Sequence, residues 1–344
     1  MGWKEREYSK NQINKAGRKI ISDNLIDDEK TQALKIISNY RSSHAYPLYV
    51  IANKLRRMLR TDYNNRKNMF VVYRLKRLDS IIAKLKRMPE MGLFGMQDIA
   101  GCRVVVNNIK QVYDIANKYE NSRIRHILYK ENDYIVNPKE SGYRSLHRVY
   151  KYVSDKKDCY NNMCIEIQFR TKLQHIWATA VETMGIYTKT NLKADAGDEH
   201  CLYFFKLVSS LFAIKEKCNT VPKVPTDIEK IKYEIRSLNS TYMILDKLET
   251  IRKAVRVVEQ NNDKQGNYYL LSLNLQTKKL TIDSYRTGKI NEASDKYRHI
   301  EEKLDANIDT VLVSAESFDE LRKAYPNYFG DVKEFINIVK KEIY

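Results

Sequence analysis

Long apolar runs are absent from this sequence, although 43% of its 344 residues are hydrophobic. A membrane-spanning helix needs about twenty consecutive apolar residues, so we predict no such helix. The first residues, MGWKEREYSKNQ, are charged and lack the apolar core of a signal peptide. Position 6 is arginine, where myristoylation would favour serine or threonine. We therefore expect no membrane anchor, and a chain long enough for two or three compact domains.

Cysteine is sparse and irregularly spaced. The five cysteines include no C-x-x-C pair. This pattern argues against a zinc site or a disulfide framework and favours a reducing compartment. We therefore expect a cytoplasmic protein.

The common motifs of nucleotide and hydrolase sites are also missing. The sequence contains no G-x-x-x-x-G-K-[ST] and no G-x-G-x-x-G, so neither a P-loop nor a dinucleotide-binding turn is predicted. It also contains no serine elbow and no H-E-x-x-H motif. Any phosphate chemistry must therefore depend on individual charged side chains.

Positive charge is abundant and unevenly distributed. The formal net charge is +18. Residues 1–97 contain 21 lysines and arginines against 9 acidic residues, whereas residues 265–344 contain 12 against 13. A basic front half suits a polyphosphate or nucleic acid partner. The alternative is an ordinary solvated surface.

The hydrophobic pattern predicts an α+β fold. Apolar residues recur at three- and four-residue steps through the first ninety residues, which predicts helices there. Residues 102–106, 146–153 and 164–171 are rich in β-branched and aromatic side chains and predict strands. Helical patterns at 109–120 and 173–189 surround them. We therefore expect a mixed β-sheet flanked by helices.

Four regions are expected along the chain. The prolines of the 219–227 stretch and the polar 261–267 stretch indicate breaks between them. The regions are a helical segment at 1–60, a mixed-sheet core at 61–195, a helical connector to 262, and a small ββαβα domain at 263–344.

Two acidic residues are candidates for chemistry because they lie beside or within predicted strands. Asp98 precedes the 102–106 strand, and Gly101 would permit a tight turn into it. Strand alternation places Glu166, Gln168 and Arg170 on one face. Carboxylates on neighbouring strands could hold Mg²⁺, which prefers one or two of them together with phosphate oxygens. A solvent-exposed charged face is the alternative.

A group of cations precedes these carboxylates. Helical spacing would bring together Arg74, Lys76, Arg77 and Lys84, which suits the binding of a triphosphate. Plain surface charge is the better explanation of each of them when it is taken alone, and their joint occurrence is the stronger evidence.

Four segments in order, RLKRLDSIIAK, DIAGCR, PKESGYRSLH and EIQFRTKLQHIWATAVE, resemble the synthetase domain of RelA/SpoT alarmone enzymes over residues 40–190. The resemblance implies transfer of pyrophosphate from ATP to a ribose 3′-hydroxyl. It implies catalytic and Mg²⁺-binding roles for Asp98 and Glu166. It implies stacking of the acceptor base on Tyr143. The implied ATP ligands are Arg74, Lys76, Arg77 and Lys84, and the implied acceptor-binding residues are Lys139, Tyr143, Arg144, His147, Gln168 and Arg170.

Some members of this family also carry a hydrolase domain with a His-Asp metal pair. None of the six histidines here is followed by aspartate. Only about forty residues precede the synthetase-like region. We therefore expect no hydrolase activity.

Two acceptors are compatible with the resemblance. Small alarmone synthetases modify GDP or GTP, whereas a toxic branch modifies the 3′-CCA end of tRNA. Two flanking segments, NYRSSHAYPL at 39–48 and VLVSAESFDELRKAYPNYF at 311–329, resemble the CapRel-type fused toxin–antitoxins of phage defence. The resemblance implies a phage protein that binds the C-terminal domain as a trigger. The basic front half favours tRNA, because its charge could engage several backbone phosphates. The guanosine nucleotide stays open as an alternative.

The C-terminal region contains a Tyr-x-x-Tyr sequence, Tyr325 to Tyr328. The resemblance implies that these aromatic side chains lie against the ATP site and inhibit the enzyme. The alternative is that both tyrosines pack the core of their own small domain.

Overall fold

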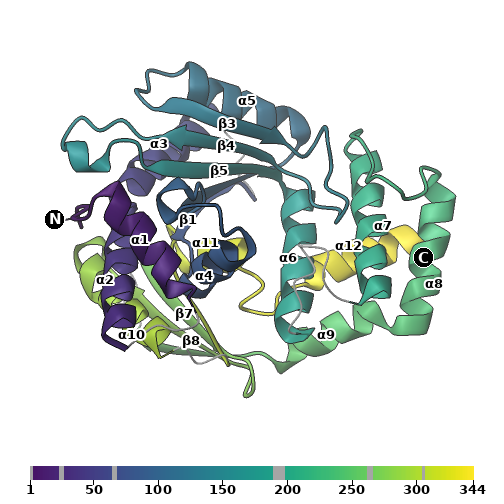
Figure 1. Ribbon diagram of the computed structural model, residues 1–344. Coiled ribbons are helices and arrows are strands. Elements are labelled where there is room, and N and C mark those ends of the chain that lie inside the picture. Colours follow the sequence, from purple (N-terminus) through teal and green to yellow (C-terminus); the bar gives the residue numbers. More distant parts are fainter. Residues whose placement is uncertain (1–2, 23–26, 64–67, 189–197, 262–265, 304–306) are drawn as a thin grey trace.

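The computed structural model describes residues 3–22, 27–63, 68–188, 198–261, 266–303 and 307–344. A single nine-stranded mixed sheet runs through the molecule (Figure 1) in the order β3-β4-β5-β2-β1-β9-β7-β8-β6. The strands are β1 (Phe70–Leu75), β2 (Ala100–Val106), β3 (Ile127–Asp133), β4 (Leu146–Lys151), β5 (Cys164–Thr171), β6 (Arg256–Asn261), β7 (Tyr268–Asn274), β8 (Lys279–Tyr285) and β9 (Ile308–Ser314). The predicted α+β class with a mixed sheet flanked by helices is confirmed.

Some helices cover the two faces of this sheet, and others pack together in a separate group at one side of it. They are α1 (Lys10–Ile20), α2 (Asp27–Ser43), α3 (Ala45–Asp62), α4 (Leu78–Arg87), α5 (Ile109–Asn121), α6 (Lys172–Thr188), α7 (Glu199–Lys215), α8 (Ile228–Tyr242), α9 (Ile244–Ala254), α10 (Ile290–Glu302), α11 (Phe318–Ala324) and α12 (Lys333–Ile343). None of the helices in the described ranges is both long and apolar enough to cross a membrane.

Each face of the sheet has its own hydrophobic cluster. On one face, side chains of α3, α5 and α10 pack on alternate strand residues such as Val71, Val104 and Ile165. On the other face, α11 and the chain after it cover Phe70 and Val105 together with residues of β7, β8 and β9. The alternation follows from the two-residue period of a strand.

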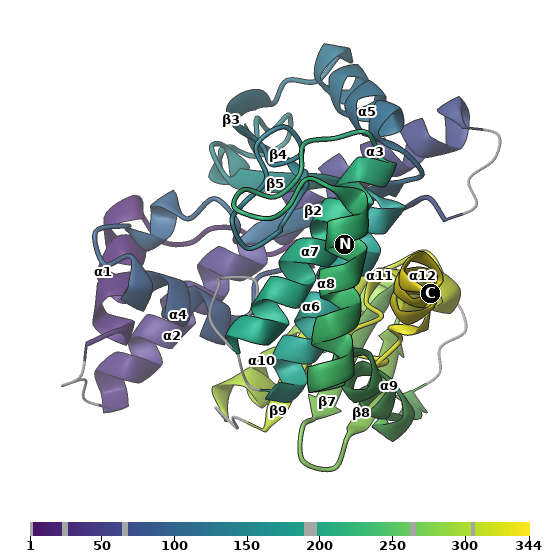
Figure 2. The ribbon, with the colours of Figure 1, turned by 90° about the vertical axis from the view of Figure 1, so that its right-hand side faces the viewer.

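The helices α6, α7, α8, α9 and α12 form a third packed layer beside the sheet (Figure 2). Phe205 and Phe212 of α7 are buried in it, and both rings contact Phe335 of α12. The last helix of the chain therefore belongs to the same core as the connector helices.

Three strands were not expected from the pattern. Residues 70–75, 127–133 and 256–261 form β1, β3 and β6, so the expectation of helix through the first ninety residues and to the end of the connector was wrong there. β1 begins with four buried apolar residues in a row, a pattern that a buried helix shares. β3 and β6 are edge strands with several exposed residues. Such strands lack the strong apolar alternation of half-buried strands.

The predicted boundary at residue 263 is crossed by the sheet itself. β9 pairs with β1 through Tyr73–Ser314 and Arg74–Val313. The cluster on the α3 side contains Tyr268 and Leu312 as well as residues of β2 and β5. The region 263–344 thus shares its cores with the rest of the chain, and its standing as a separate domain stays a prediction.

Candidate active site

The predicted site residues converge on the α11 face of strands β1, β2, β4 and β5. In the register of the sheet, Gly101 lies between Arg74 on β1 and Glu166 on β5. His147 on β4 is paired with Gln168 on β5. Glu166 and Arg170 both contact Gln168 through their side chains, so the predicted common face of these three residues is confirmed.

Asp98, in the turn just before β2, is held by two lysines. Lys76 Nζ lies 2.9 Å from its Oδ2, and Lys84 Nζ lies 2.8 Å from its Oδ1. Burial alone would raise the pKa of Asp98, but the two ammonium groups outweigh it and lower that pKa. The site therefore holds a carboxylate already paired with two of the predicted phosphate ligands.

The four predicted ATP ligands do not share one helix. Arg74 lies in β1, Lys76 follows that strand, Arg77 is the N-cap residue of α4, and Lys84 is inside α4. The strand-to-helix turn brings the two lysines to Asp98, and the expected helical spacing was wrong.

Glu166 accepts hydrogen bonds at both carboxylate oxygens. His147 Nδ1 donates to Oε1 at 2.9 Å, and Gln168 Nε2 donates to Oε2 at 2.7 Å. Burial is the largest influence and would raise the pKa of Glu166, but these bonds outweigh it and lower that pKa. Asp98 comes three residues before Gly101, which pairs with Glu166 in the sheet, and the charge of Asp98 acts to raise the pKa of Glu166.

Gly101 has a different role from the expected turn. It is the second residue of β2 and is not among the described residues with positive φ. A Cβ built on it would meet no atom within 4 Å. Between Arg74 and Glu166 the sheet surface is therefore open, which leaves room for a ligand.

Tyr143 reaches the site from a tight turn. Gly142 has φ +87°, and a Cβ there would lie 2.9 Å from the Trp177 ring, so the turn requires glycine. The Tyr143 ring is 7% exposed, with Lys139 Nζ and Arg170 Cζ at 5.4 and 5.1 Å from its centroid. Two cations therefore lie close to the ring on which an acceptor base is expected to stack.

Arg144 lies apart from the other predicted acceptor ligands. Its side chain is buried, donates to Ser209 Oγ at 3.2 Å and forms an ion pair with Glu216 at 3.0 Å. It joins the turn to α7 and does not contact the residues around Glu166 in any recorded hydrogen bond or ion pair of the described residues.

Within the described residues, no three carboxylate, imidazole or thiol groups gather as a metal site. The neighbouring carboxylates of Asp98 and Glu166 nevertheless suit Mg²⁺, since this ion uses one or two protein carboxylates and completes its shell with water and phosphate oxygens.

Residues 73–192 match the family model described as the region found in RelA / SpoT proteins. We name residues 73–192 the RelA/SpoT region after this match. It contains all four motifs and every predicted site residue except Tyr325 and Tyr328.

Two curated relatives match the RelA/SpoT region in sequence. The chain is 32% identical over 125 residues to GTP pyrophosphokinase YjbM of Bacillus subtilis (strain 168), covering 36% of this chain and 59% of that protein. It is 34% identical over 126 residues to GTP pyrophosphokinase YwaC of the same organism, covering 34% and 57%. The chain thus matches somewhat more than half the length of these relatives.

Solved structures are also similar. Small alarmone synthetase 1 from Bacillus subtilis, bound to its product pppGpp, has a TM-score of 0.45 and 23% identity, and the match covers 55% of this chain and 94% of that chain. Small alarmone synthetase 2 from the same organism has a TM-score of 0.44 and 24% identity, with 52% and 93% covered.

The C-terminal residues Tyr325 and Tyr328 are buried on the α11 face of the sheet. They share a cluster with Phe70 and Val72 of the RelA/SpoT side and with β7, β8 and β9. Burial raises the pKa of Tyr325 to about 12, and the charges of Arg103 and Arg74 oppose that rise. The tyrosines therefore pack a core to which both parts of the chain contribute, near cations of the candidate site.

Two contact residues were missed from the sequence. Asp309 of β9 accepts a hydrogen bond from the Tyr328 hydroxyl at 3.0 Å and forms an ion pair with Arg77. Arg103 of β2 donates to the Ala324 carbonyl at 3.2 Å. The sequence did offer a signal for each: Asp309 lies at the start of a β-branched run, and Arg103 lies inside another.

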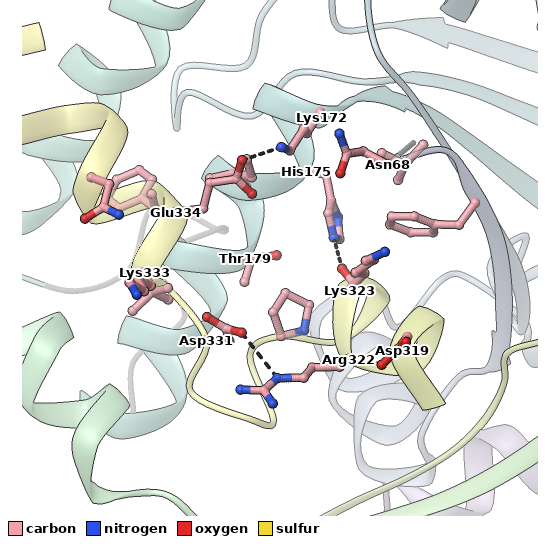
Figure 3. Close-up of a pocket in the computed structure, with 17 residues that line it drawn as sticks. Asn68, Lys172, His175, Thr179, Asp319, Arg322, Lys323, Asp331, Lys333 and Glu334 are labelled. Atoms are coloured by element: carbon pink, nitrogen blue, oxygen red, sulfur yellow. Dashed lines mark hydrogen bonds and ion pairs between the residues drawn. The ribbon is translucent and has the colours of Figure 1, made fainter. Parts of the chain in front are cut away.

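A cavity of about 430 Å³ lies on the same face, between α6 and the C-terminal helices (Figure 3). Lys172–Glu334 and Arg322–Asp331 ion pairs lie at its edges, and His175 Nε2 donates to the Lys323 carbonyl. None of the predicted site residues lines this cavity. It marks the junction of the RelA/SpoT region with α11 and α12, which the His175 hydrogen bond helps to hold together.

Proposed function

We propose that the chain is an ATP-dependent pyrophosphokinase that transfers pyrophosphate to a ribose 3′-hydroxyl. The observation that carries this proposal is the placement of two carboxylates beside open space at Gly101: Glu166 pairs with Gly101 in the sheet, and Asp98 lies in the turn that leads into the same strand. Two lysines hold the first carboxylate, and two hydrogen bonds hold the second. The names of the sequence relatives, both GTP pyrophosphokinases, support the same reaction class.

The proposed reaction forms a bond between the 3′-oxygen and the β-phosphorus of ATP and breaks the bond from that phosphorus to the α,β-bridging oxygen, so AMP leaves. Glu166 accepts the proton of the 3′-hydroxyl. Arg74, Lys76 and Lys84 bind the phosphates, which lowers the cost of the charge that develops during transfer. Asp98 and Glu166 would hold Mg²⁺, whose charge neutralises phosphate oxygens when it is bound.

We propose the 3′-CCA end of tRNA as the acceptor. The net charge of +12 over residues 1–97 supports it, since several backbone phosphates could be bound at once. A guanosine nucleotide, GDP or GTP, is the second candidate, and the names of the relatives favour it. With tRNA the product would block aminoacylation, and the chain would act as a toxin in phage defence.

We further propose that residues 263–344 inhibit this reaction. Asp309 pairs with Arg77 and accepts a hydrogen bond from Tyr328, so the C-terminal region occupies a predicted ATP ligand. A tethered region acts at an effective concentration in the millimolar range, so weak contacts suffice. A phage protein that binds this region would release the site.

The test uses the full-length chain, because residues 263–344 contribute to its cores. ATP labelled at the γ-phosphate is offered with bulk tRNA or with GDP and GTP. The chain is compared with its Tyr325→Ala/Tyr328→Ala variant and with Glu166→Gln in that variant. We expect label on tRNA, faster transfer by the double variant, and none after Glu166→Gln.

Three results would change the proposal. Label on guanosine nucleotide alone would make the chain an alarmone synthetase. Equal rates with and without the two tyrosines would remove their inhibitory role. No transfer to any acceptor by either chain would contradict the pyrophosphokinase.

A further inference from the structure

One side chain, His147, connects the predicted acceptor platform to the predicted base. Its Nε2 lies 2.7 Å from the Tyr143 hydroxyl, and its Nδ1 lies 2.9 Å from Glu166 Oε1. Both ring nitrogens are therefore engaged, one by each residue.

The surrounding hydrogen bonds extend this chain. Arg170 Nη2 donates to the Tyr143 oxygen at 2.6 Å, and that oxygen also shares the hydrogen bond with His147. Arg170 also donates to Gln168 Oε1 at 2.9 Å, and Gln168 donates to Glu166. The five side chains form a closed ring of hydrogen bonds, in which Arg170 only donates and the Glu166 carboxylate only accepts.

Packing restricts the same side chains. Tyr143, His147 and Arg170 are 7%, 8% and 2% exposed. The Tyr134 ring lies edge-on to Tyr143 and His147, with centroids 6.0 and 5.3 Å away. The side chain of Glu166 is 16% exposed, so the end of the chain that would meet a hydroxyl is the more accessible one.

We propose that His147 is a positioning residue, which fixes the Glu166 carboxylate relative to the Tyr143 ring. The inference rests on the proposed function, in which Tyr143 stacks on a flat acceptor base and Glu166 takes the proton of the ribose hydroxyl. The Nδ1–H group donates to Glu166 whether or not Nε2 carries a proton. The Glu166 carboxylate is thus held in a fixed position relative to the Tyr143 ring, which orients the acceptor. A misplacement of about 1 Å at such a site can lower the rate about 10²-fold.

A positioning role for His147 predicts a loss of turnover, measured as kcat, with little change in substrate binding, measured as KM. Tyr143→Phe keeps the aromatic ring for stacking and removes only the hydroxyl that holds His147. We expect the kcat of this variant to fall about 10- to 100-fold, with the KM for the acceptor and for ATP within about twofold of the parent. His147→Asn keeps a donor near the position of Nδ1, so its kcat should exceed that of His147→Leu.

The experiment measures kcat and both KM values in the full-length chain and in the same chain released by Asp309→Asn. The control is Tyr134→Phe, which removes a hydroxyl from the neighbouring ring. Nitrogen-15 NMR of histidine gives an independent readout, because Nδ1–H of His147 should be present in the parent and its signal should shift in Tyr143→Phe. Melting temperatures show whether each variant is folded.

The outcomes are distinct. A parent that transfers label while Tyr143→Phe matches its kcat, or loses only acceptor KM, overturns this inference and leaves the proposed function intact. Loss of kcat in Tyr134→Phe to the same extent also overturns it, since any lost hydroxyl would then suffice. A parent that transfers no label in either background overturns the proposed function and this inference with it.

Discussion

The carboxylate of Asp309 forms an ion pair with the guanidinium of Arg77, which joins strand β9 to the N-terminus of helix α4. The same carboxylate oxygen accepts the hydroxyl of Tyr328. Asp309 of the C-terminal region is thus paired with an arginine that the family resemblance assigns to ATP binding. Its carboxylate offers the guanidinium the oxygen contacts that a phosphate would offer.

Removal of that charge should release the site. We expect Asp309→Asn in the full-length chain to raise the rate of label transfer about 10- to 150-fold, since hydrogen bonds to charged groups are worth about 1.5–3 kcal/mol and each 1.4 kcal/mol is about tenfold. The measurement is transfer from γ-labelled ATP at an ATP concentration below KM. Asp295→Asn, which removes an exposed acid from α10, is the matched control. An unchanged rate for Asp309→Asn would show that Arg77 does not limit ATP binding.

A single methyl group added at Gly101 should lower activity without lowering stability. An added Cβ meets no protein atom, so Gly101→Ala should leave the urea midpoint unchanged or slightly higher. In the proposed site the methyl would occupy ligand space between Arg74 and Glu166, and we expect kcat/KM to fall at least tenfold. Gly95→Ala is the control, because its Cβ also meets open space. Full activity of Gly101→Ala would place the ligand elsewhere.

The buried ion pair between Arg41 of α2 and Glu301 of α10 should contribute strongly to the stability of the fold. The two side chains are 5% and 7% exposed and 2.5 Å apart, and Glu301 also accepts from the Leu78 amide at the start of α4. Loss of one partner leaves a buried charge, so Glu301→Gln should lower the free energy of unfolding by about 3–5 kcal/mol. Urea unfolding measures it.

The control for this pair lies on the same helix. Glu292 forms an exposed pair with Lys289, and Glu292→Gln should change the free energy of unfolding by less than about 1 kcal/mol. Equal effects of the two substitutions would argue that Glu301 is not held by Arg41 in solution.

Stability should fall as the pH drops from 7 to 4. Burial lowers the pKa of His44 to about 4, whereas the unfolded chain takes up this proton near its ordinary value. The unfolded state therefore binds more protons between these values, and the stability lost by pH 5 is about 2 kcal/mol for this residue.

The pH dependence of the urea midpoint tests this estimate. His44→Gln should flatten the slope between pH 7 and 5, even if it lowers stability at every pH. His299→Gln, on the exposed side of α10, should leave the slope unchanged. Parallel slopes for the parent and His44→Gln would contradict the predicted neutral, buried histidine.

Local pattern predicted part of this site correctly. The two-residue period of residues 164–171 placed Glu166, Gln168 and Arg170 on one face, and the structure joins them by hydrogen bonds. The strand period is set by neighbouring residues in the chain, so it is visible in the sequence.

Long-range partners were not predictable in this way. Arg77 and Asp309 are 232 positions apart, and only the pairing of β9 with β1 brings them together. His147 was expected at the acceptor, but its contact with Glu166 depends on the register between β4 and β5. β1 itself was missed, so the junction that it makes with β9 could not be foreseen.

The position of β9 has a consequence for protein synthesis. At about 5–20 residues per second, a ribosome needs roughly 6–25 s to advance from the end of the RelA/SpoT region at residue 192 to the end of β9 at residue 314. During that interval the nascent chain has the strands β1 to β5 but lacks β9, which pairs with β1 on the side opposite β2. Each newly made molecule therefore passes through a period in which Arg77 has no Asp309 to pair with, and slow translation of the last third of the message would lengthen it.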